Sequence, residues 1–403
     1  MTKEKNSGWY AIWRWLLCRC LELFYRRMEV IGLENIPSDK PVIFASNHTN
    51  ALMDPLVITY FSGKQHYFMT RGDIFKGLMD KIFRSWRMLP LYRMKDGIET
   101  LGKNEAVMEF ATNRLVSGGS MIIFPEGSHF WIRQVHPLRK GLVRMAYDVL
   151  NKDPETELVV IPVGLYYNDM VRINQDVLVN FGEPISVKNF PREENQQRTF
   201  LNFNQELREK MKEQLIEIPL EGAAYKQAEA WRIELENRFK SLSLKWSYRY
   251  QKEFIAIISQ PDFQEQIREM VLSLDEILQI EGLQQWWMGI YPSLYRDNLE
   301  YPWLNVLKYP FYWISFLQFL PVFLLGKKIL GSIKDSTFHC SVKFGLALLV
   351  QPFFALMQAG IAALIFQSWW AFPIYLISMP IWALLFTEWR GKRSVILDPA
   401  PLK

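Results

Sequence analysis

Cysteine is scarce in this sequence, and neither sign of charge is in large excess. The three cysteines, Cys18, Cys20 and Cys340, are too few for a disulfide framework or a four-cysteine metal site. We expect them to be small apolar side chains that are buried or face lipid. Lysine and arginine number 47 against 42 aspartates and glutamates, a net charge of +5 that does not suggest a nucleic-acid-binding protein. The 403 residues also contain no internal repeat and no low-complexity tract.

Aromatic residues, by contrast, are abundant, with 15 Trp, 17 Tyr and 27 Phe. Residues 9–28 have no small-residue cleavage site, and charges interrupt their apolar run, so we do not expect a signal peptide. On a helical wheel, one side of this segment carries Trp9, Trp13, Leu16, Leu17, Cys20 and Phe24. The other side carries Arg14, Arg19, Glu22 and Arg26. We predict that residues 1–28 form an amphipathic helix in a membrane interface; the alternative is a surface helix packed on the next domain.

Residues 29–191 alternate short apolar runs with helical patterns. The predicted strands are 41–46, 66–70, 87–92, 119–124, 158–165 and 177–182. The predicted helices are 52–62, 73–84, 98–117 and 138–151. Such alternation is typical of a layered α/β domain with a mostly parallel sheet. Pro162 lacks an N–H within its strand, so we expect it at a sheet edge, a strand end or a bulge.

Residues 192–300 are charged, helix-forming and nearly free of strand patterns. Apolar residues recur at helical spacing in 198–215, 222–247 and 263–280, which predicts a helical subdomain. We find no chemistry in it.

Residues 301–403 are strongly apolar and are predicted to be membrane-embedded. Three blocks stand out, at 309–326, 344–366 and 369–387, and the last two carry no charge. A span needs about 20 residues, which the second block provides. Basic residues lie before the second block and after the third, so the positive-inside rule predicts that both flanks are in the cytoplasm and that 344–387 is a helical hairpin. The block 309–326 would then be re-entrant or interfacial; three spans are the alternative.

The segment Asn47–Asp54 lies between a predicted strand and a predicted helix, where ligands and catalytic groups collect in α/β sheets. The imidazole of His48 is a base near neutral pH, with an unperturbed pKa of about 6.5. A carboxylate such as that of Asp54 can fix its tautomer and stabilise the imidazolium that forms when it takes a proton. The alternative is a helix N-terminus that Asn47 or Asn50 caps, with Asp54 as a solvated acid.

Other polar residues follow further strands. Arg93 ends the strand 87–92 and could clamp a phosphate, since guanidinium groups form paired bonds to phosphate oxygens. Glu126, Gly127 and Ser128 follow the strand 119–124, where glycine lets a ligand approach the backbone and a glutamate could accept a hydroxyl. Arg139 and Lys140 open a predicted helix and offer cations to a phosphate.

The order of these motifs is more specific than any one of them. Over roughly residues 28–190 the chain resembles the glycerolipid acyltransferases, the family of lysophosphatidate and glycerol-3-phosphate acyltransferases. The matching segments are Asn47-His48 with Asp54, Pro90-Leu91-Tyr92-Arg93, Phe124-Pro125-Glu126-Gly127-Ser128 and Val160-Ile161-Pro162-Val163-Gly164. The resemblance implies that His48 is the general base and that Asp54 orients it. It also implies that Arg93, Glu126 and Gly127 bind a phosphorylated acceptor, and that the fourth segment helps to hold the acyl donor.

Two features depart from the family pattern. Five residues separate His48 from Asp54 where four are usual, as in a subset that includes fungal enzymes accepting glycerol 3-phosphate or dihydroxyacetone phosphate. The third segment usually continues Glu-Gly-Thr-Arg, whereas this chain has Ser128 and His129 in the last two places. Serine can replace the threonine hydroxyl, but histidine is not a fixed charge. Arg133, Arg139 or Lys140 could supply the missing cation.

We therefore expect a membrane-bound O-acyltransferase of phospholipid biosynthesis, with its α/β domain facing the cytoplasm. It would transfer a fatty acyl group from acyl-CoA or acyl-carrier protein to a hydroxyl of a phosphorylated glycerol. No metal or other cofactor is expected. The alternatives are a lysophospholipid-remodelling acyltransferase and a non-catalytic lipid-binding protein on the same fold.

Overall fold

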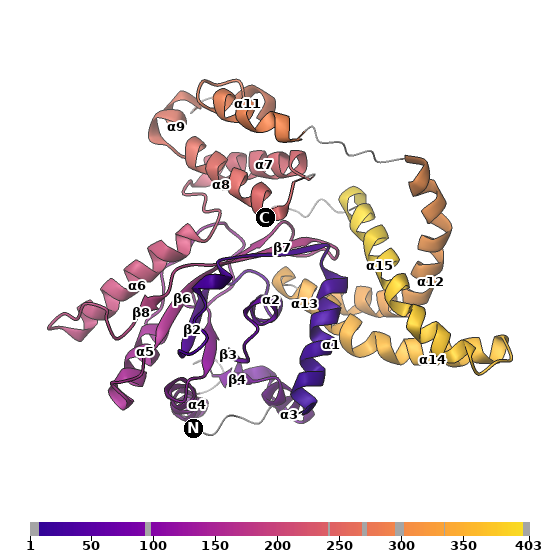
Figure 1. Cartoon of the computed structure of the whole chain (residues 1–403), viewed down its shortest axis with the longest axis horizontal. Helices are drawn as coiled ribbons and strands as arrows, with labels where there is room; N and C mark the ends of the chain where they lie inside the picture. Colours follow the sequence, from indigo (N-terminus) through magenta and orange to yellow (C-terminus); the bar gives the residue numbers. More distant parts are fainter. Residues whose placement is uncertain are drawn as a thin grey trace.

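An eight-stranded sheet forms the centre of the first half of the chain in the computed structural model, which describes residues 8–92, 98–240, 242–267, 272–294, 302–333 and 335–397. Figure 1 shows the sheet with helices on both sides. Seven strands follow one another in the order β1 (Arg27–Ile31), β7 (Asp176–Phe181), β6 (Val159–Tyr167), β2 (Val42–Ser46), β5 (Ser120–Ile123), β3 (His66–Arg71) and β4 (Met88–Leu91). The eighth, β8 (Ile185–Ser186), pairs with β6 outside this order. The five strands from β6 to β4 are parallel, which confirms the predicted α/β domain.

Apolar side chains alternate between the two faces of the sheet, as the period of two along a strand requires. Phe44 and Ile122 face the core shared with α2 (Met53–Ser62), whereas Ile43 and Met121 face the opposite core. That second core contains residues of α4 (Ile98–Val116), α5 (Gly141–Lys152) and α6 (Gln196–Glu213). Because both faces are covered, the central strands read as continuous apolar runs in the sequence.

One predicted helix begins later than expected. The pattern at 73–84 folds as a 3-10 turn over Gly72–Ile74, followed by the helix α3 (Leu78–Ser85). Gly77 lies just before α3 with a φ of 55°, which a side chain would strain, so the backbone turns there before the helix starts.

The prediction that Pro162 lies at an edge, a strand end or a bulge was wrong, because β6 is an interior strand. On one side β6 pairs in parallel with β2. On the other side the antiparallel partner changes from β8 (Ile185–Ser186) at residues 159–160 to β7 at residues 163–167. The Pro162 carbonyl accepts a hydrogen bond from Gly182 N at 2.8 Å on that second side. The backbone N and C=O of a strand residue point to the same side of the strand. The N–H that Pro162 lacks would therefore point to the side where the partner changes from β8 to β7.

The region 192–300 forms helices, but its first helix, α6, packs in the second core of the sheet rather than with the helices that come after it. A helical subdomain follows α6. It consists of α7 (Gly222–Arg238), α8 (Leu244–Ile258), α9 (Pro261–Ile267), α10 (Leu274–Ile277) and α11 (Leu283–Leu294). The pattern 222–247 is therefore two helices, since α7 ends at Arg238 and α8 begins at Leu244. The subdomain core includes Tyr166 of β6 and Leu178 of β7, so this part of the chain packs on the sheet.

The C-terminal part contains α12 (Pro302–Ser332), α13 (His339–Gly345), a π-helical turn (Leu346–Val350), α14 (Gln351–Ile365) and α15 (Ala371–Leu397). Figure 1 shows α12, α14 and α15 beside the sheet domain. Two helical stretches, Tyr309–Ser332 and Ser336–Ile365, are long and apolar enough to cross a membrane. Apolar side chains on them are exposed, among them Phe353 at 73% and Leu364 at 80%. Helix α12 is continuous across Pro310 and Pro321, and the topology of the 309–326 block in a membrane stays a prediction.

The face of the N-terminal helix that was predicted to meet a membrane packs on the protein instead. In α1 (Gly8–Phe24), Trp13, Leu16, Leu17 and Cys20 contact the apolar core, and Leu21 and Phe24 are buried in it. The alternative of a helix packed on the α/β domain is therefore correct for this face. Among the described large apolar side chains of α1, Ile12 and Trp15 remain exposed, at 62% and 63%. The side chain of Trp9 lies outside the described residues.

Candidate functional site

The candidate site forms where β2 ends. Because β2 and β6 run in parallel with Ser46 opposite Val163, the residues that follow Ser46 lie beside the last residues of β6. Asn47 prolongs this pairing with its side chain. Its Oδ1 accepts from Leu165 N at 2.8 Å, and its Nδ2 donates to Leu165 O at 3.2 Å. These two bonds fix the start of the loop that carries His48.

His48 and Asp54 are in direct contact, as predicted from the sequence. The His48 Nδ1 and Asp54 Oδ2 atoms are 2.7 Å apart. The same Oδ2 accepts from the backbone N–H groups of Thr49 and Asn50, at 2.9 and 2.8 Å. Asp54 Oδ1 accepts from the hydroxyl of Tyr167 at 2.8 Å. Asp54 has no exposed surface, which rules out the alternative of a solvated first-turn acid.

These contacts select the tautomer of the neutral histidine ring. Asp54 is an acceptor toward three other donors, so the shared proton lies on His48 Nδ1 and points at the carboxylate. His48 Nε2 then carries the lone pair and can accept a proton. The buried carboxylate would stabilise the imidazolium that results. The pair can therefore act as a general base without a nucleophilic serine.

Two aromatic rings hold the His48 imidazole in place. Phe124 stacks on it with the ring centroids 3.8 Å apart, and His129 lies at 3.9 Å. His129 in turn contacts Phe338 of the C-terminal part at 5.5 Å. Burial, together with the neighbouring His48, lowers the pKa of His129 to about 4. His129 is therefore neutral at pH 7 and supplies no fixed positive charge.

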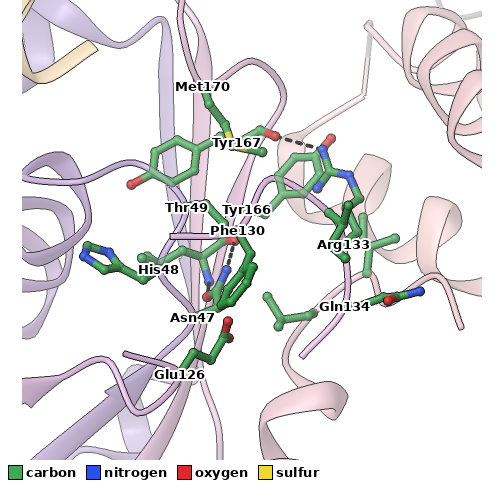
Figure 2. A pocket seen from close by; sticks show the side chains of 14 residues that line it. Asn47, His48, Thr49, Glu126, Phe130, Arg133, Gln134, Tyr166, Tyr167 and Met170 are labelled. Carbon is green, nitrogen blue, oxygen red and sulfur yellow. Dashed lines mark hydrogen bonds between the residues drawn. The ribbon is translucent and has the colours of Figure 1, made fainter. Parts of the chain in front are cut away.

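A pocket adjoins this pair, and Figure 2 shows Phe130 between His48 and Arg133, with the His48 ring directed away from both Phe130 and Arg133. The residues that line it come from the β2 loop, the segment after β5, strand β6 and the linker after α6. They are Asn47, His48, Thr49, Glu126, Phe130, Ile132, Arg133, Gln134, Leu165, Tyr166, Tyr167, Met170, Leu215 and Ile216.

Glu126 is the acidic residue of this pocket lining. Its side chain is almost fully buried, and its Oε1 atom has no hydrogen-bond partner among the described residues. Burial raises the pKa of Glu126 to about 8, although nearby Arg208 opposes the shift. At pH 7 the side chain is therefore mostly a neutral carboxylic acid that can donate as well as accept a hydrogen bond.

The other predicted residues lie differently. Gly127, Ser128, Arg139 and Lys140 are exposed, and none of them is among the residues that line the pocket. Gly127 has a φ of 72°, and the Arg139 side chain packs over it so closely that an added Cβ would clash with the Arg139 guanidinium. Their binding roles stay predictions. Arg93 falls outside the described residues.

Three neighbours of the motif were not predicted from the sequence. Tyr167 is 113 residues from Asp54, yet it lies near the end of β6, whose parallel pairing with β2 was the available signal. Ser341 Oγ accepts from Leu52 N at 3.1 Å, and Phe338 covers His129. Both belong to the C-terminal part, and nothing in the local sequence links them to the motif. Within the described ranges, no group of three or more His, Cys, Asp or Glu side chains is arranged to hold a metal ion.

Parts of the chain are similar to known acyltransferases. Residues 27–166 match the Acyltransferase family. An uncharacterized acyltransferase of Schizosaccharomyces pombe is 32% identical over 74 residues, which are 18% of this chain and 11% of that protein. Glycerol-3-phosphate O-acyltransferase 2 of Saccharomyces cerevisiae is 29% identical over 84 residues, 21% of this chain and 11% of the yeast protein. The chain thus spans about a tenth of the length of these curated relatives.

Among solved structures, the chain is similar to the 1-acyl-sn-glycerophosphate acyltransferase PlsC of Thermotoga maritima. The TM-score is 0.36 at 19% sequence identity, over 52% of this chain and 83% of that one.

Proposed function

We propose that this chain transfers a fatty acyl group from a thioester to a hydroxyl of a phosphorylated glycerol, which the match of residues 27–166 to the Acyltransferase family and the similarity to a glycerol-3-phosphate O-acyltransferase support. The observation that carries the proposal is the contact between His48 Nδ1 and the buried Asp54 carboxylate, which leaves Nε2 to act as a base.

The acyl group would pass directly from the thioester to the acceptor, without a covalent enzyme intermediate. His48 Nε2 takes the proton of the acceptor hydroxyl as its oxygen attacks the thioester carbonyl carbon. The tetrahedral intermediate collapses with cleavage of the C–S bond, and the departing thiolate takes the proton from the imidazolium. The products are an oxygen ester and a free thiol, and the histidine returns to its starting state.

Two features support a location at the membrane. The stretches Tyr309–Ser332 and Ser336–Ile365 have the length and composition of membrane spans, and their apolar side chains are exposed. Segment 336–344, which begins the second stretch, also packs against the site, through Phe338 on His129 and Ser341 on the backbone of Leu52. A long acyl chain could therefore reach His48 from the lipid. We propose that the α/β domain faces the cytoplasm, which the basic flanks of the apolar blocks support.

The proposal is tested by incubating membranes that contain the full chain with labelled acyl-CoA and one acceptor at a time. The acceptors are glycerol 3-phosphate, 1-acylglycerol 3-phosphate and lysophosphatidylcholine, with acyl-carrier protein as a second donor. We expect label to appear in the product of one of the first two acceptors. Labelling of lysophosphatidylcholine alone would indicate a remodelling enzyme instead, and no labelled product from any acceptor would overturn the proposal.

A further inference from the structure

Residues 336–344 of the C-terminal part pack against loop 47–52, which carries His48. They form a 3-10 turn and most of the helix α13, and they begin the apolar stretch Ser336–Ile365. Figure 1 shows α13 beside the sheet domain and α14 leading away from it. Segment 336–344 therefore connects the candidate membrane span directly with the candidate site.

This segment is anchored in the α/β domain. Phe344 is buried in the core that α2 shares with the sheet. Its ring lies against Phe24 of α1, with the ring centroids 5.4 Å apart. Lys343 Nζ donates to the backbone carbonyl of Val171 at 2.7 Å. The segment therefore has a fixed place relative to the sheet, from which it can position other groups.

Ser341 supplies a contact that loop 47–52 lacks an acceptor for. Leu52 is the N-cap of α2 and has no side-chain cap of its own, and its backbone N–H donates to Ser341 Oγ at 3.1 Å. In a capping box the third residue of the helix accepts this hydrogen bond, but in α2 that residue is Pro55. Next to Leu52, Ala51 has a φ of 39°, a conformation that strains a residue with a side chain. Ser341 therefore stabilises the loop beside its strained point.

Both faces of the His48 imidazole are covered. The centroids of the Phe124 and His129 rings lie 3.8 and 3.9 Å from that of His48, and two rings this close would overlap if they shared one face. They therefore cover opposite faces, and a substrate can reach the imidazole only at its edge. Phe338 packs edge-on against His129, with the centroids 5.5 Å apart and 65° between the rings. One of the two rings that hold the imidazole is thus held in turn by segment 336–344.

We propose that segment 336–344 holds the His48 imidazole in its catalytic orientation, with Ser341 and Phe338 as positioning residues. Ser341 acts through the backbone of the loop, and Phe338 acts through His129. The inference rests on the proposed acyl transfer and adds to its site two residues from a distant part of the chain. The apolar stretch that supports a membrane location thereby also sets the geometry of the base.

The first experiment tests Ser341 by steady-state kinetics of the full chain in membranes, with acyl-CoA and the acceptor that the wild type labels. For Ser341→Ala we expect kcat to fall about 3- to 10-fold, the size expected for one lost hydrogen bond, with both KM values within about twofold of the wild type. Ser341→Thr should recover most of kcat, because its hydroxyl can again accept from Leu52 N.

Ser332→Ala is the matched control, since Ser332 is an exposed serine of α12 whose hydroxyl donates within its own helix. It should behave as the wild type does. An unchanged kcat in Ser341→Ala, or a threonine variant no more active than the alanine variant, would overturn the inference while leaving the proposed function intact.

The second experiment tests whether Phe338 acts through His129. Phe338→Ala and His129→Ala should each lower kcat about 10-fold, because a small misplacement of a catalytic group has an effect of this size. If one residue acts through the other, the double variant should be no slower than His129→Ala alone. Phe366→Ala is the control, since Phe366 is 72% exposed at the end of α14. Two losses that simply multiply, or no loss in Phe338→Ala, would contradict the inference.

Hydrogen exchange of the backbone amides separates the inference from the proposed function, because it needs no acyl transfer. In Ser341→Ala the amide of Leu52 should exchange about 3- to 10-fold faster than in the wild type, whereas Ser332→Ala should leave it unchanged. Faster exchange without any acyl transfer would mean that the proposed function is wrong and the positioning of the loop is right. Equal exchange in Ser341→Ala and the wild type would contradict the inference, whatever the activity.

Discussion

Replacing Asp54 with asparagine separates the charge of the pair from its geometry. Three donors converge on one oxygen of Asp54, namely His48 Nδ1 and the backbone N–H groups of Thr49 and Asn50. In Asp54→Asn the amide oxygen must take this position, since an NH₂ group there would face three donors. The amide NH₂ then meets the hydroxyl of Tyr167, which can turn to accept. The variant should keep both the fold and the histidine tautomer.

What the variant loses is the negative charge beside the imidazolium. At an effective dielectric constant of about 20 and a separation of about 4 Å, that attraction is worth about 4 kcal/mol. The transition state carries most of the imidazolium charge, so kcat should fall about 10³-fold. The assay follows free thiol released from acyl-CoA at saturating acceptor. Circular dichroism and the melting temperature check that the fold is kept.

Asp80→Asn is the control, since Asp80 pairs with Arg84 at the surface of α3, away from the pocket. It should retain full activity. A kcat for Asp54→Asn within tenfold of the wild type, in a normally folded protein, would refute the electrostatic role of Asp54 and leave it only an orienting one.

Three further predictions concern stability. Glu126→Gln should have a higher melting temperature than the wild type, and the difference should grow from pH 5 to pH 8. The reason is that the glutamate ionises near its ordinary pKa of 4.5 in the unfolded chain but at about 8 in the folded one, so rising pH destabilises only the wild type. A difference in melting temperature that does not change with pH would contradict this. Ser341→Ala removes the acceptor of Leu52 N and should cost about 1 kcal/mol in a denaturant titration, and no measurable loss would show that the contact is dispensable. Gly127→Ala adds a Cβ against Arg139 at a positive φ and should cost about 1–3 kcal/mol, so a neutral result would argue against that backbone geometry.

The sequence predicted the sheet well because its strands are buried on both faces and therefore stand out as apolar runs. It also predicted that His48 and Asp54 would meet, since both lie in one short segment between a strand and a helix. Glu126 follows β5, the neighbour of β2, so its place in the same pocket follows from the order of parallel strands. Local patterns and strand order are enough for these features.

The parts that were missed depend on contacts between distant segments. Tyr167, Ser341 and Phe338 reach the site only because the strands of the sheet pair and the C-terminal part packs on them. The amphipathic pattern of α1 shows that one face is apolar but not whether lipid or protein covers it. In the structure the protein core covers that face. Pro162 was misplaced because its tolerance depends on a change of partner strand, which a single strand does not reveal.

The central claim is that the imidazole at position 48 removes the proton from the attacking alcohol. The most direct measurement is the rate of transfer of labelled acyl groups by His48→Ala in membranes, at protein levels matched to the wild type. Loss of general-base catalysis should lower turnover about 10²- to 10⁴-fold, with the same amount of protein in the membrane fraction. Turnover equal to that of the wild type would show that another group performs this step.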